Sequence, residues 1–195
     1  MTILKKVILA SKSPRRQELL KSLGLNFSLM LPESDESYPE DLPPHLVPEY
    51  LSAKKAESVG KQLHYGEIVI AADTIVLFRN DIFGKPHNED EAMKMLHQLS
   101  DNMHEVITGV TMLTSTDKVS FSVNTQVYFR KLSAKMIKDY VIKYKPLDKA
   151  GSYGIQDWIG LVGIEKISGC YYNVMGLPVS RLMVELNEMG YIITS

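Results

Sequence analysis

Residues 7–24, VILASKSPRRQELLKSLG, decide the fold class, because they place a buried strand directly before a capped helix. The run 7–10 is short and apolar, which is typical of a buried strand. Ser13 stands at the N-cap position, Pro14 at the first helical position and Gly24 at the end of the helix. The stretch therefore predicts a strand, turn and helix unit, as found in α/β proteins.

The rest of the chain interleaves strand and helix patterns, with no internal repeat, low-complexity segment or flexible linker. We expect strands at 27–31, 67–78, 105–114 and 119–130, the last two as a hairpin. We expect one helix after the proline-rich loop at 32–48 and a second that begins at Asn88, with Glu91 as its capping-box partner. A third helix is expected from Ser133 to about Tyr144, and a fourth after Pro178, ending at Gly190. The glycine-rich stretch 150–177 is expected to form short strands around site-forming loops. These patterns predict one α/β domain over residues 1–195.

The composition indicates an ordinary globular domain. The chain has 195 residues, of which 45% are apolar and 23% charged, so it can bury a sizeable core. With 22 Lys and Arg against 23 Asp and Glu, the near-zero net charge argues against nucleic acid or an anionic membrane as partner. The lone Cys170 cannot form an internal disulfide, and no apolar run is long enough for a signal peptide or a membrane span. The cytoplasm is the expected location.

The SKSPRR turn at residues 11–16 contains more than a helix start needs. A helix N-terminus presents unpaired N–H groups and a partial positive charge, and the Ser11 and Ser13 hydroxyls add donors. Arg15 and Arg16 in the first turn oppose the helix dipole unless an anion or a carboxylate joins them. The turn therefore predicts a phosphate site, and the alternative is two solvated arginines on a capped helix.

Asp73 lies inside the apolar run EIVIAADTIVLF, where an ionised carboxylate is costly to bury unless it is paired, binds a metal or lines a cleft. The alternative is an aspartate at a bulge, satisfied by the backbone. Lys85, between Gly84 and Pro86, is held on a stiff turn that can aim a cation at a phosphate, or it is an ordinary turn lysine.

Two further features stay open from the sequence alone. Lys54 and Lys55 lie about 100° apart on their helix, so one can face a groove while the other faces solvent, and the periodicity does not choose between them. Glu33, Asp35 and Glu36 can supply a metal ligand or form a solvated acidic loop.

Taken in order, the segments SKSPRRQELL, AADTIV, FGKP, KAGSYGIQ and YNVMGLP resemble the Maf family over nearly the whole chain. The resemblance implies an α/β fold with a mixed central sheet flanked by helices and two lobes about a cleft. It implies a nucleoside triphosphate pyrophosphatase that converts NTP and water to NMP and pyrophosphate, with a divalent cation such as Mg²⁺ or Mn²⁺. A homodimer and a role in septum formation are also suggested by it.

The resemblance also implies roles for individual residues. It gives Asp73 the role of proton acceptor and, with Glu36, of metal ligand. It assigns substrate choice to Arg15, Thr74 and Gln156, and it implies that the phosphates are bound by Ser11, Ser13, Arg16, Lys55 and Lys85. The 7-methyl-GTP branch carries a glutamate near the position of Gln156, so the resemblance points to dTTP and UTP, whose bases offer an acceptor beside an N–H to a glutamine amide.

The chain departs from the family pattern directly after this glutamine. Asp157 and Trp158 stand where the family usually has glycine next, a difference that can reshape the base pocket. Three alternatives remain beside the dTTP/UTP pyrophosphatase: a 7-methyl-GTP pyrophosphatase, a nucleotide-binding regulator of division without useful turnover, and a sugar-nucleotide transferase. The presence of Asp73, Lys85 and both arginines favours turnover.

Overall fold

The computed structural model describes residues 2–3 and 6–193, and the side chains of residues 6–191. Its strands are β1 (Thr2–Ile3), β2 (Lys6–Leu9), β3 (Phe27–Leu29), β4 (Glu67–Phe78), β5 (Asp81–Phe83), β6 (Met103–Leu113), β7 (Lys118–Phe129), β8 (Ile164–Ser168) and β9 (Ile192–Ile193). Its α-helices are α1 (Pro14–Ser22), α2 (Val47–Gly60), α3 (Glu89–Leu99), α4 (Ala134–Tyr144), α5 (Trp158–Gly163), α6 (Tyr171–Met175) and α7 (Val179–Glu188). Short 3₁₀ turns cover Pro44–Leu46 and Ala150–Ser152.

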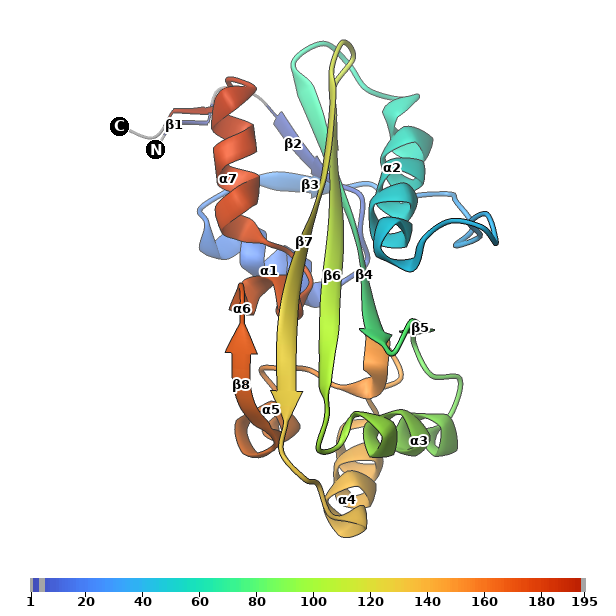
Figure 1. Ribbon diagram of the computed structural model, residues 1–195. Coiled ribbons are helices and arrows are strands. Elements are labelled where there is room, and N and C mark those ends of the chain that lie inside the picture. The colour runs from blue at the N-terminus through green and yellow to red at the C-terminus, as the bar shows by residue number, and fades with distance from the viewer. Residues whose placement is uncertain (1, 4–5, 194–195) are drawn as a thin grey trace. The chain divides into compact units, whose positions relative to one another are not determined.

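Seven of these strands form one mixed sheet, in the order β3-β2-β4-β6-β7-β8 with β5 paired to β4 (Figure 1). β2 runs parallel to both β3 and β4, with Val7 opposite Phe27 on one side and Ile68 on the other. β5 and β8 pair antiparallel with β4 and β7. β1 and β9 form a separate antiparallel pair. The expected mixed α/β sheet flanked by helices is therefore confirmed.

The chain divides into two compact units. The first contains Met1–Asp73, Thr108–Val123 and Gly176–Ser195, and the second contains Thr74–Ile107 and Asn124–Met175. The long strand β4 passes from one to the other directly after Asp73. A cleft between two lobes and a single domain over residues 1–195 stay predictions.

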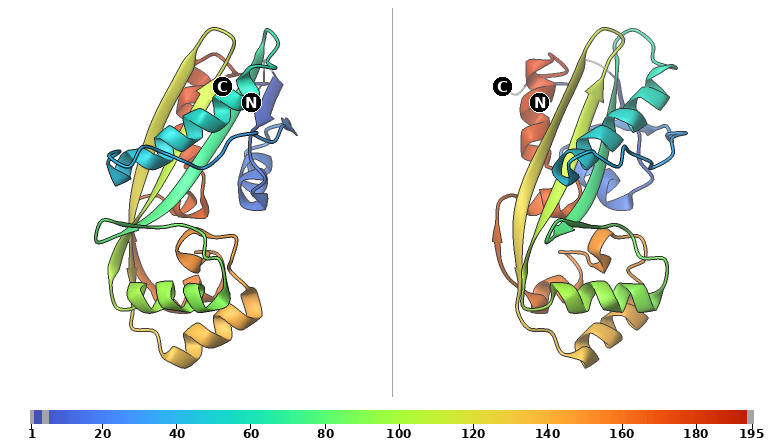
Figure 2. Two further views of the ribbon diagram at one scale, coloured as in Figure 1. Left: turned by 90° about the vertical axis from the view of Figure 1, so that its right-hand side faces the viewer. Right: turned by 45° about the vertical axis from the view of Figure 1, so that its right-hand side comes forward.

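The core of the first unit forms on both faces of β2 and β4. Successive residues of a strand point to opposite faces, and here both sets are buried. On one face, Ile8 and Val69 pack against Ala56 and Val59 of α2. Helix α7 lies on the other side of these strands (Figures 1 and 2).

The core of the second unit forms between helices and the remaining parts of the long strands. Helices α3 and α4 lie side by side, and Leu96 and Ile137 are fully buried between them and the strands (Figure 2). Tyr140 of α4 is also fully buried in this core, together with Phe129 and Tyr153.

Most of the elements expected from the sequence are present. β4 has the expected bounds, and the Asn88 and Ser133 side chains cap α3 and α4 by accepting from the backbone N–H groups of Glu91 and Met136. Ser13 is the N-cap residue of α1 and Pro14 begins the helix, as expected, although the Ser13 side chain makes no capping hydrogen bond. One expectation is wrong. The stretch 150–177 is mostly helical turns with the single strand β8, because its glycines allow close backbone contacts, as at Gly160 against the Ile155 carbonyl.

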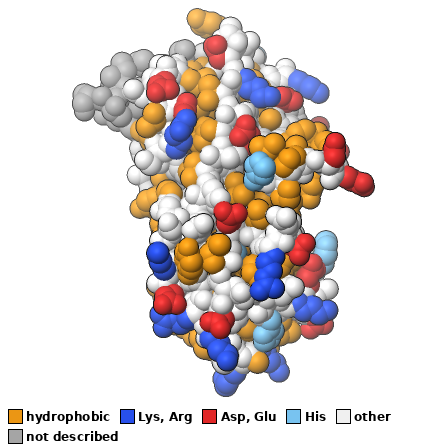
Figure 3. Space-filling model, in the orientation of Figure 1, with side chains coloured by type: hydrophobic (Ala, Val, Ile, Leu, Met, Phe, Trp, Pro, Cys, Tyr) orange, Lys and Arg blue, Asp and Glu red, His pale blue; other side chains and the backbone are white. Residues whose placement is uncertain are grey.

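The surface carries both signs of charge. On the face shown in Figure 3, Lys and Arg side chains are interspersed with Asp and Glu side chains, in keeping with a formal net charge of −1. Among the described helices, none combines the length and the apolar character needed to cross a membrane.

Candidate active site

The SKSPRR turn follows β2 and is organised by its first serine. Ser11 is buried, and its hydroxyl accepts hydrogen bonds from the Ser13 N–H at 3.2 Å and from Arg16 Nη1 at 3.3 Å. β2 lies between two parallel neighbours, so the turn leaves the carboxyl end of a buried strand and α1 begins there. Such an edge is where α/β sheets commonly bind ligands.

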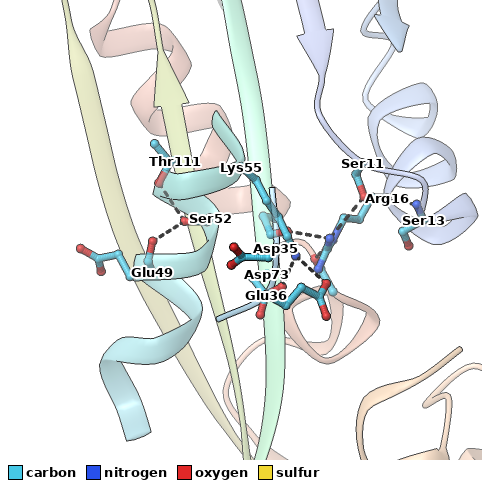
Figure 4. Close-up of polar contacts among 12 residues, drawn as sticks. Ser11, Ser13, Arg16, Asp35, Glu36, Glu49, Ser52, Lys55, Asp73 and Thr111 are labelled. Carbon is cyan, nitrogen blue, oxygen red and sulfur yellow. Dashed lines mark hydrogen bonds and ion pairs between the residues drawn. The ribbon is translucent and has the colours of Figure 1, made fainter. Parts of the chain in front are cut away.

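Arg16 connects this turn to two distant backbone segments (Figure 4). Its Nη1 donates to the Ala72 carbonyl oxygen at 2.7 Å, and its Nε donates to the Gly176 carbonyl oxygen at 2.8 Å. Burial lowers the pKa of the Arg16 guanidinium, and the negative charge of Asp73 opposes this effect. Arg16 therefore fixes the backbone next to Asp73 and brings a positive charge to that carboxylate.

Asp73 is paired with a lysine side chain. Lys55 Nζ of α2 lies 2.5 Å from Asp73 Oδ1, and the two side chains are only 12% and 13% exposed. The same Nζ lies 3.1 Å from Oε1 of Glu36, whose side chain is 59% exposed. One ammonium group therefore holds two carboxylates, which offsets the cost of burying Asp73 (Figure 4).

The neighbouring lysine holds the acidic loop to α2. Lys54 Nζ contacts the Asp35 carboxylate and donates to the Ser37 carbonyl and hydroxyl oxygens, each at 3.0 Å. The hydrogen bonds from Lys54 and then from Ser37 hold the pKa of Asp35 well below its usual range. The structure thus settles the choice that the periodicity left open: Lys55 faces Asp73, and Lys54 fastens the loop that carries Glu36.

Helix α2 is seated closely on the sheet, which fixes the position of Lys55. Gly109 of β6 lies against the start of α2, and a Cβ there would come within 2.3 Å of the Glu49 nitrogen. The buried Ser52 and Thr111 hydroxyls lie 2.8 Å apart and join the helix to β6 (Figure 4). No sequence signal indicated these contacts, because they join residues about 60 positions apart.

The remaining predicted residues lie in other surroundings. Arg15 is half-buried in the first turn of α1, within the first unit. Thr74, Lys85 and Gln156 belong to the second unit, where Lys85 and Gln156 are exposed and Thr74 is half-buried. The backbone next to Lys85 is fixed, since the Gly84 carbonyl oxygen accepts from the Gly151 N–H at 3.1 Å.

The donor set around Asp73 suits a cation that arrives with a phosphate ligand. Within residues 2–3 and 6–193, no three His, Cys, Asp or Glu side chains gather into a metal site. Asp73 and Glu36 nevertheless converge on the same Lys55 ammonium. Mg²⁺ is commonly held by one or two carboxylates together with water and substrate phosphates, so two carboxylates fit that mode.

Comparison with known proteins identifies the family. The family model described as Maf-like protein matches residues 6–189. The chain is 50% identical to a dTTP/UTP pyrophosphatase of Phocaeicola vulgatus, over 94% of this chain and 96% of that protein. It is 51% identical to a dTTP/UTP pyrophosphatase of Cytophaga hutchinsonii, over 94% of this chain and 84% of that protein. The solved structure of the Staphylococcus aureus Ham1 protein superposes on 64% of this chain and on 72% of the Ham1 chain, with 15% sequence identity and a TM-score of 0.47. Because the Maf-like family model matches residues 6–189 and the dTTP/UTP pyrophosphatases align along nearly the whole chain, the chain belongs to the Maf family.

Proposed function

We propose that the chain is a nucleoside triphosphate pyrophosphatase that hydrolyses dTTP and UTP to the monophosphate and pyrophosphate. Relatives about half identical to it carry the name dTTP/UTP pyrophosphatase. The observation that carries the proposal is the Asp73 carboxylate, placed in a buried strand beside the Lys55 ammonium and within the electrostatic influence of Arg16. A proton acceptor beside fixed cations is what hydrolysis of a phosphoric anhydride requires.

In the proposed reaction a water oxygen bonds to the α-phosphorus. The bond from that phosphorus to the oxygen bridging the α- and β-phosphates breaks, and pyrophosphate leaves with the bonding electrons. Asp73 takes a proton of the attacking water. Lys55 orients the Asp73 carboxylate before the nucleotide binds, and its charge then stabilises the negative phosphate oxygens.

The other cations and hydroxyls have supporting roles in this proposal. Ser11, Ser13, Lys85 and the Arg16 charge bind phosphate oxygens, and Ser11 also shapes the turn through the two hydrogen bonds it accepts. Glu36 and Asp73 would hold the divalent cation, Mg²⁺ or Mn²⁺. When bound, that cation would neutralise negative charge on the phosphates.

Substrate choice is proposed to rest on Gln156, with Arg15 and Thr74. A glutamine amide has one acceptor and one donor side, which match the N–H and the neighbouring carbonyl of uracil or thymine. Gln156 is the one exposed residue in the stretch 151–156, as a residue that contacts a ligand needs to be. One functional domain over residues 1–195 and a cytoplasmic location, both expected from the sequence, and a homodimer, suggested by the resemblance, complete the proposal.

The test is release of pyrophosphate from dTTP, UTP, CTP, GTP, ATP and 7-methyl-GTP with Mg²⁺. We expect turnover of dTTP and UTP, with nucleoside monophosphate and no diphosphate as the second product. Asp73→Asn should lower kcat by about 100-fold or more, the usual range for losing a general base. Asp117→Asn, in the exposed turn between β6 and β7, is the matched control and should leave kcat unchanged.

The other outcomes separate the alternatives. Turnover of 7-methyl-GTP in place of dTTP would move the chain to that branch of the family. A rise in Tm with dTTP but no turnover of any triphosphate would favour the regulatory protein. Full activity of Asp73→Asn would refute the role of Asp73 as base.

A further inference from the structure

The loop that carries Gln156 is a tight turn, and a buried phenol of another element contacts both of its ends. The Asp157 N–H donates to the Gly154 carbonyl oxygen at 3.0 Å, so Gly154 and Asp157 are the ends of a β-turn with Ile155 and Gln156 at its centre. Ile155 is buried in the core of the second unit, whereas Gln156 is exposed. The turn therefore anchors one central side chain and presents the other.

The phenol is that of Tyr140, from the middle of α4. Its hydroxyl donates to Asp157 Oδ2 at 2.9 Å and accepts from the Gly154 N–H at 3.4 Å. Tyr140 is fully buried, and burial and then the charge of Asp157 raise the pKa of the phenol above its usual value. The hydroxyl therefore keeps its proton at neutral pH and stays a donor to the Asp157 carboxylate.

Asp157 is held on a second side as well. Lys149 Nζ lies 3.8 Å from Asp157 Oδ2, and the two side chains are 13% and 18% exposed. A carboxylate that accepts from a buried phenol and faces a lysine has little freedom to move.

The amide of Gln156 lies next to this contact. A Cβ built on Gly154 would come within 2.6 Å of Asp157 Oδ2 and 2.9 Å of Gln156 Nε2, so both groups lie over the bare α-carbon of Gly154. Displacing the Asp157 carboxylate would therefore disturb the surroundings of the Gln156 amide directly.

We propose that Tyr140 and Asp157 are positioning residues that fix the Gly154–Asp157 turn and thereby orient the Gln156 amide for a pyrimidine with a carbonyl beside an N–H. The inference rests on the proposed function, because it specifies how the same enzyme chooses its base. Discrimination is strongest where a misplaced partner leaves polar groups unpaired, so a rigid amide separates UTP from CTP, which presents an amino group in place of that carbonyl. A mobile amide separates them poorly.

The experiment measures kcat and KM for dTTP, UTP and CTP in wild type and Tyr140→Phe, with Tm as a check on folding. Tyr140→Phe keeps the buried ring and removes only the hydroxyl. We expect KM for UTP to rise about tenfold with kcat within about threefold, and the ratio of kcat/KM for UTP over CTP to fall about tenfold. Tyr144→Phe is the matched control, since Tyr144 stacks on Tyr140 in the same helix but is partly exposed, and its selectivity should equal that of wild type.

Two variants of Asp157 provide a second, independent measurement. Asp157→Ala removes the acceptor and should lose selectivity as Tyr140→Phe does. Asp157→Asn keeps an oxygen that accepts from the phenol and should retain most of the selectivity. If Tyr140→Phe does not fold, the difference in UTP over CTP selectivity between Asp157→Ala and Asp157→Asn tests the proposal on its own.

The outcomes distinguish the inference from the function beneath it. If wild type releases no pyrophosphate from any triphosphate, the proposed function is refuted and the inference with it. If wild type prefers UTP over CTP and both Tyr140→Phe and Asp157→Ala keep that preference, the inference alone is overturned. An equal loss of kcat for all three nucleotides would likewise overturn it, because that is the effect of general destabilisation.

Discussion

The ion pair between Lys55 and Asp73 should stabilise the protein measurably before any nucleotide binds. The perturbation is a double-mutant cycle of Lys55→Met and Asp73→Asn, which measures the coupling of the two charges free of their other contacts. At an effective dielectric constant of about 20, two unit charges about 4 Å apart attract by about 4 kcal/mol, and the Lys55 and Asp73 groups, joined at 2.5 Å, are at least this close. Glu36 remains a partner for Lys55, and the Arg16 charge remains near Asp73, so part of this energy survives each single substitution. We expect a coupling of about 2 kcal/mol.

The assay is urea denaturation of the four proteins without nucleotide, at low salt and in 0.5 M NaCl. With side chains only 12% and 13% exposed, the coupling should survive the added salt, which screens exposed pairs. In a parallel thermal unfolding measurement, each single variant should lose about 4–8 °C in Tm, at about 2–4 °C per kcal/mol for a chain of this size. The exposed pair Lys135 and Asp139 on α4 is the control, with an expected coupling of about 0.5 kcal/mol or less. A Lys55–Asp73 coupling as small as the control, or one that disappears in salt, would refute the reasoning.

Two further predictions concern stability. Burial lowers the pKa of His104 from 6.5 to about 3. Between these pH values the unfolded chain binds a proton on this imidazole that the folded protein does not bind. The stability that neutral His104 contributes is therefore complete above pH 6.5 and is lost as the pH falls toward 3. From pH 7.5 to pH 5 wild type should lose about 2 kcal/mol more than His104→Gln by urea denaturation, and equal losses would contradict the assignment. Gly109→Ala should lower the free energy of unfolding by about 3 kcal/mol or more, because the added Cβ would lie 2.3 Å from the backbone of Pro48 and Glu49. Gly84→Ala is the control: the space around Gly84 is open, so the free energy of unfolding should change by less than about 1 kcal/mol. Thermal unfolding of Gly109→Ala and Gly84→Ala tests this prediction. Similar Tm values for the two variants would contradict it and show that α2 can shift without loss of stability.

Where local chemistry decides the structure, the sequence was a good guide. The apolar run of β4 and the Asn88 and Ser133 caps depend on neighbours within a few positions, and all three are present as expected. Ser13 shows the limit of such reasoning. Its position and the following proline mark the helix start correctly, but its hydroxyl makes no capping hydrogen bond. Instead, its backbone N–H donates to the Ser11 hydroxyl oxygen. Sequence spacing identifies the boundary, whereas the partner of each polar atom depends on the surrounding turn.

The candidate site shows the same division. Asp73 was notable because a carboxylate in an apolar strand needs a partner, and that inference from burial is correct. Its partner lies 18 residues away on α2, and only the packing of that helix on β6 decides between Lys54 and Lys55. Tyr140 gave no signal at all, since one tyrosine on an amphipathic helix has the pattern of an ordinary core residue. Its significance comes from the polar atoms that its hydroxyl meets in the fold.

The charges around Asp73 explain why such a cluster can exist without its ligand and why the ligand needs additional positive charge. Arg16 and Lys55 carry two positive charges, and Glu36 and Asp73 carry two negative ones, so these four groups cancel and the burial of Asp73 is tolerable. A triphosphate meeting only these four groups would find no excess of positive charge, because the two carboxylates offset the two cations. Additional positive charge would come from the N-terminus of α1, from the other cations of the proposed site, Arg15 and Lys85, or from a divalent cation that the two carboxylates would hold. The two carboxylates therefore weaken the binding of a nucleotide without a metal, because they repel its phosphates, and strengthen the binding of a nucleotide that arrives with a divalent cation, because they can hold that cation. This is the physical reason for including a metal in the proposed function.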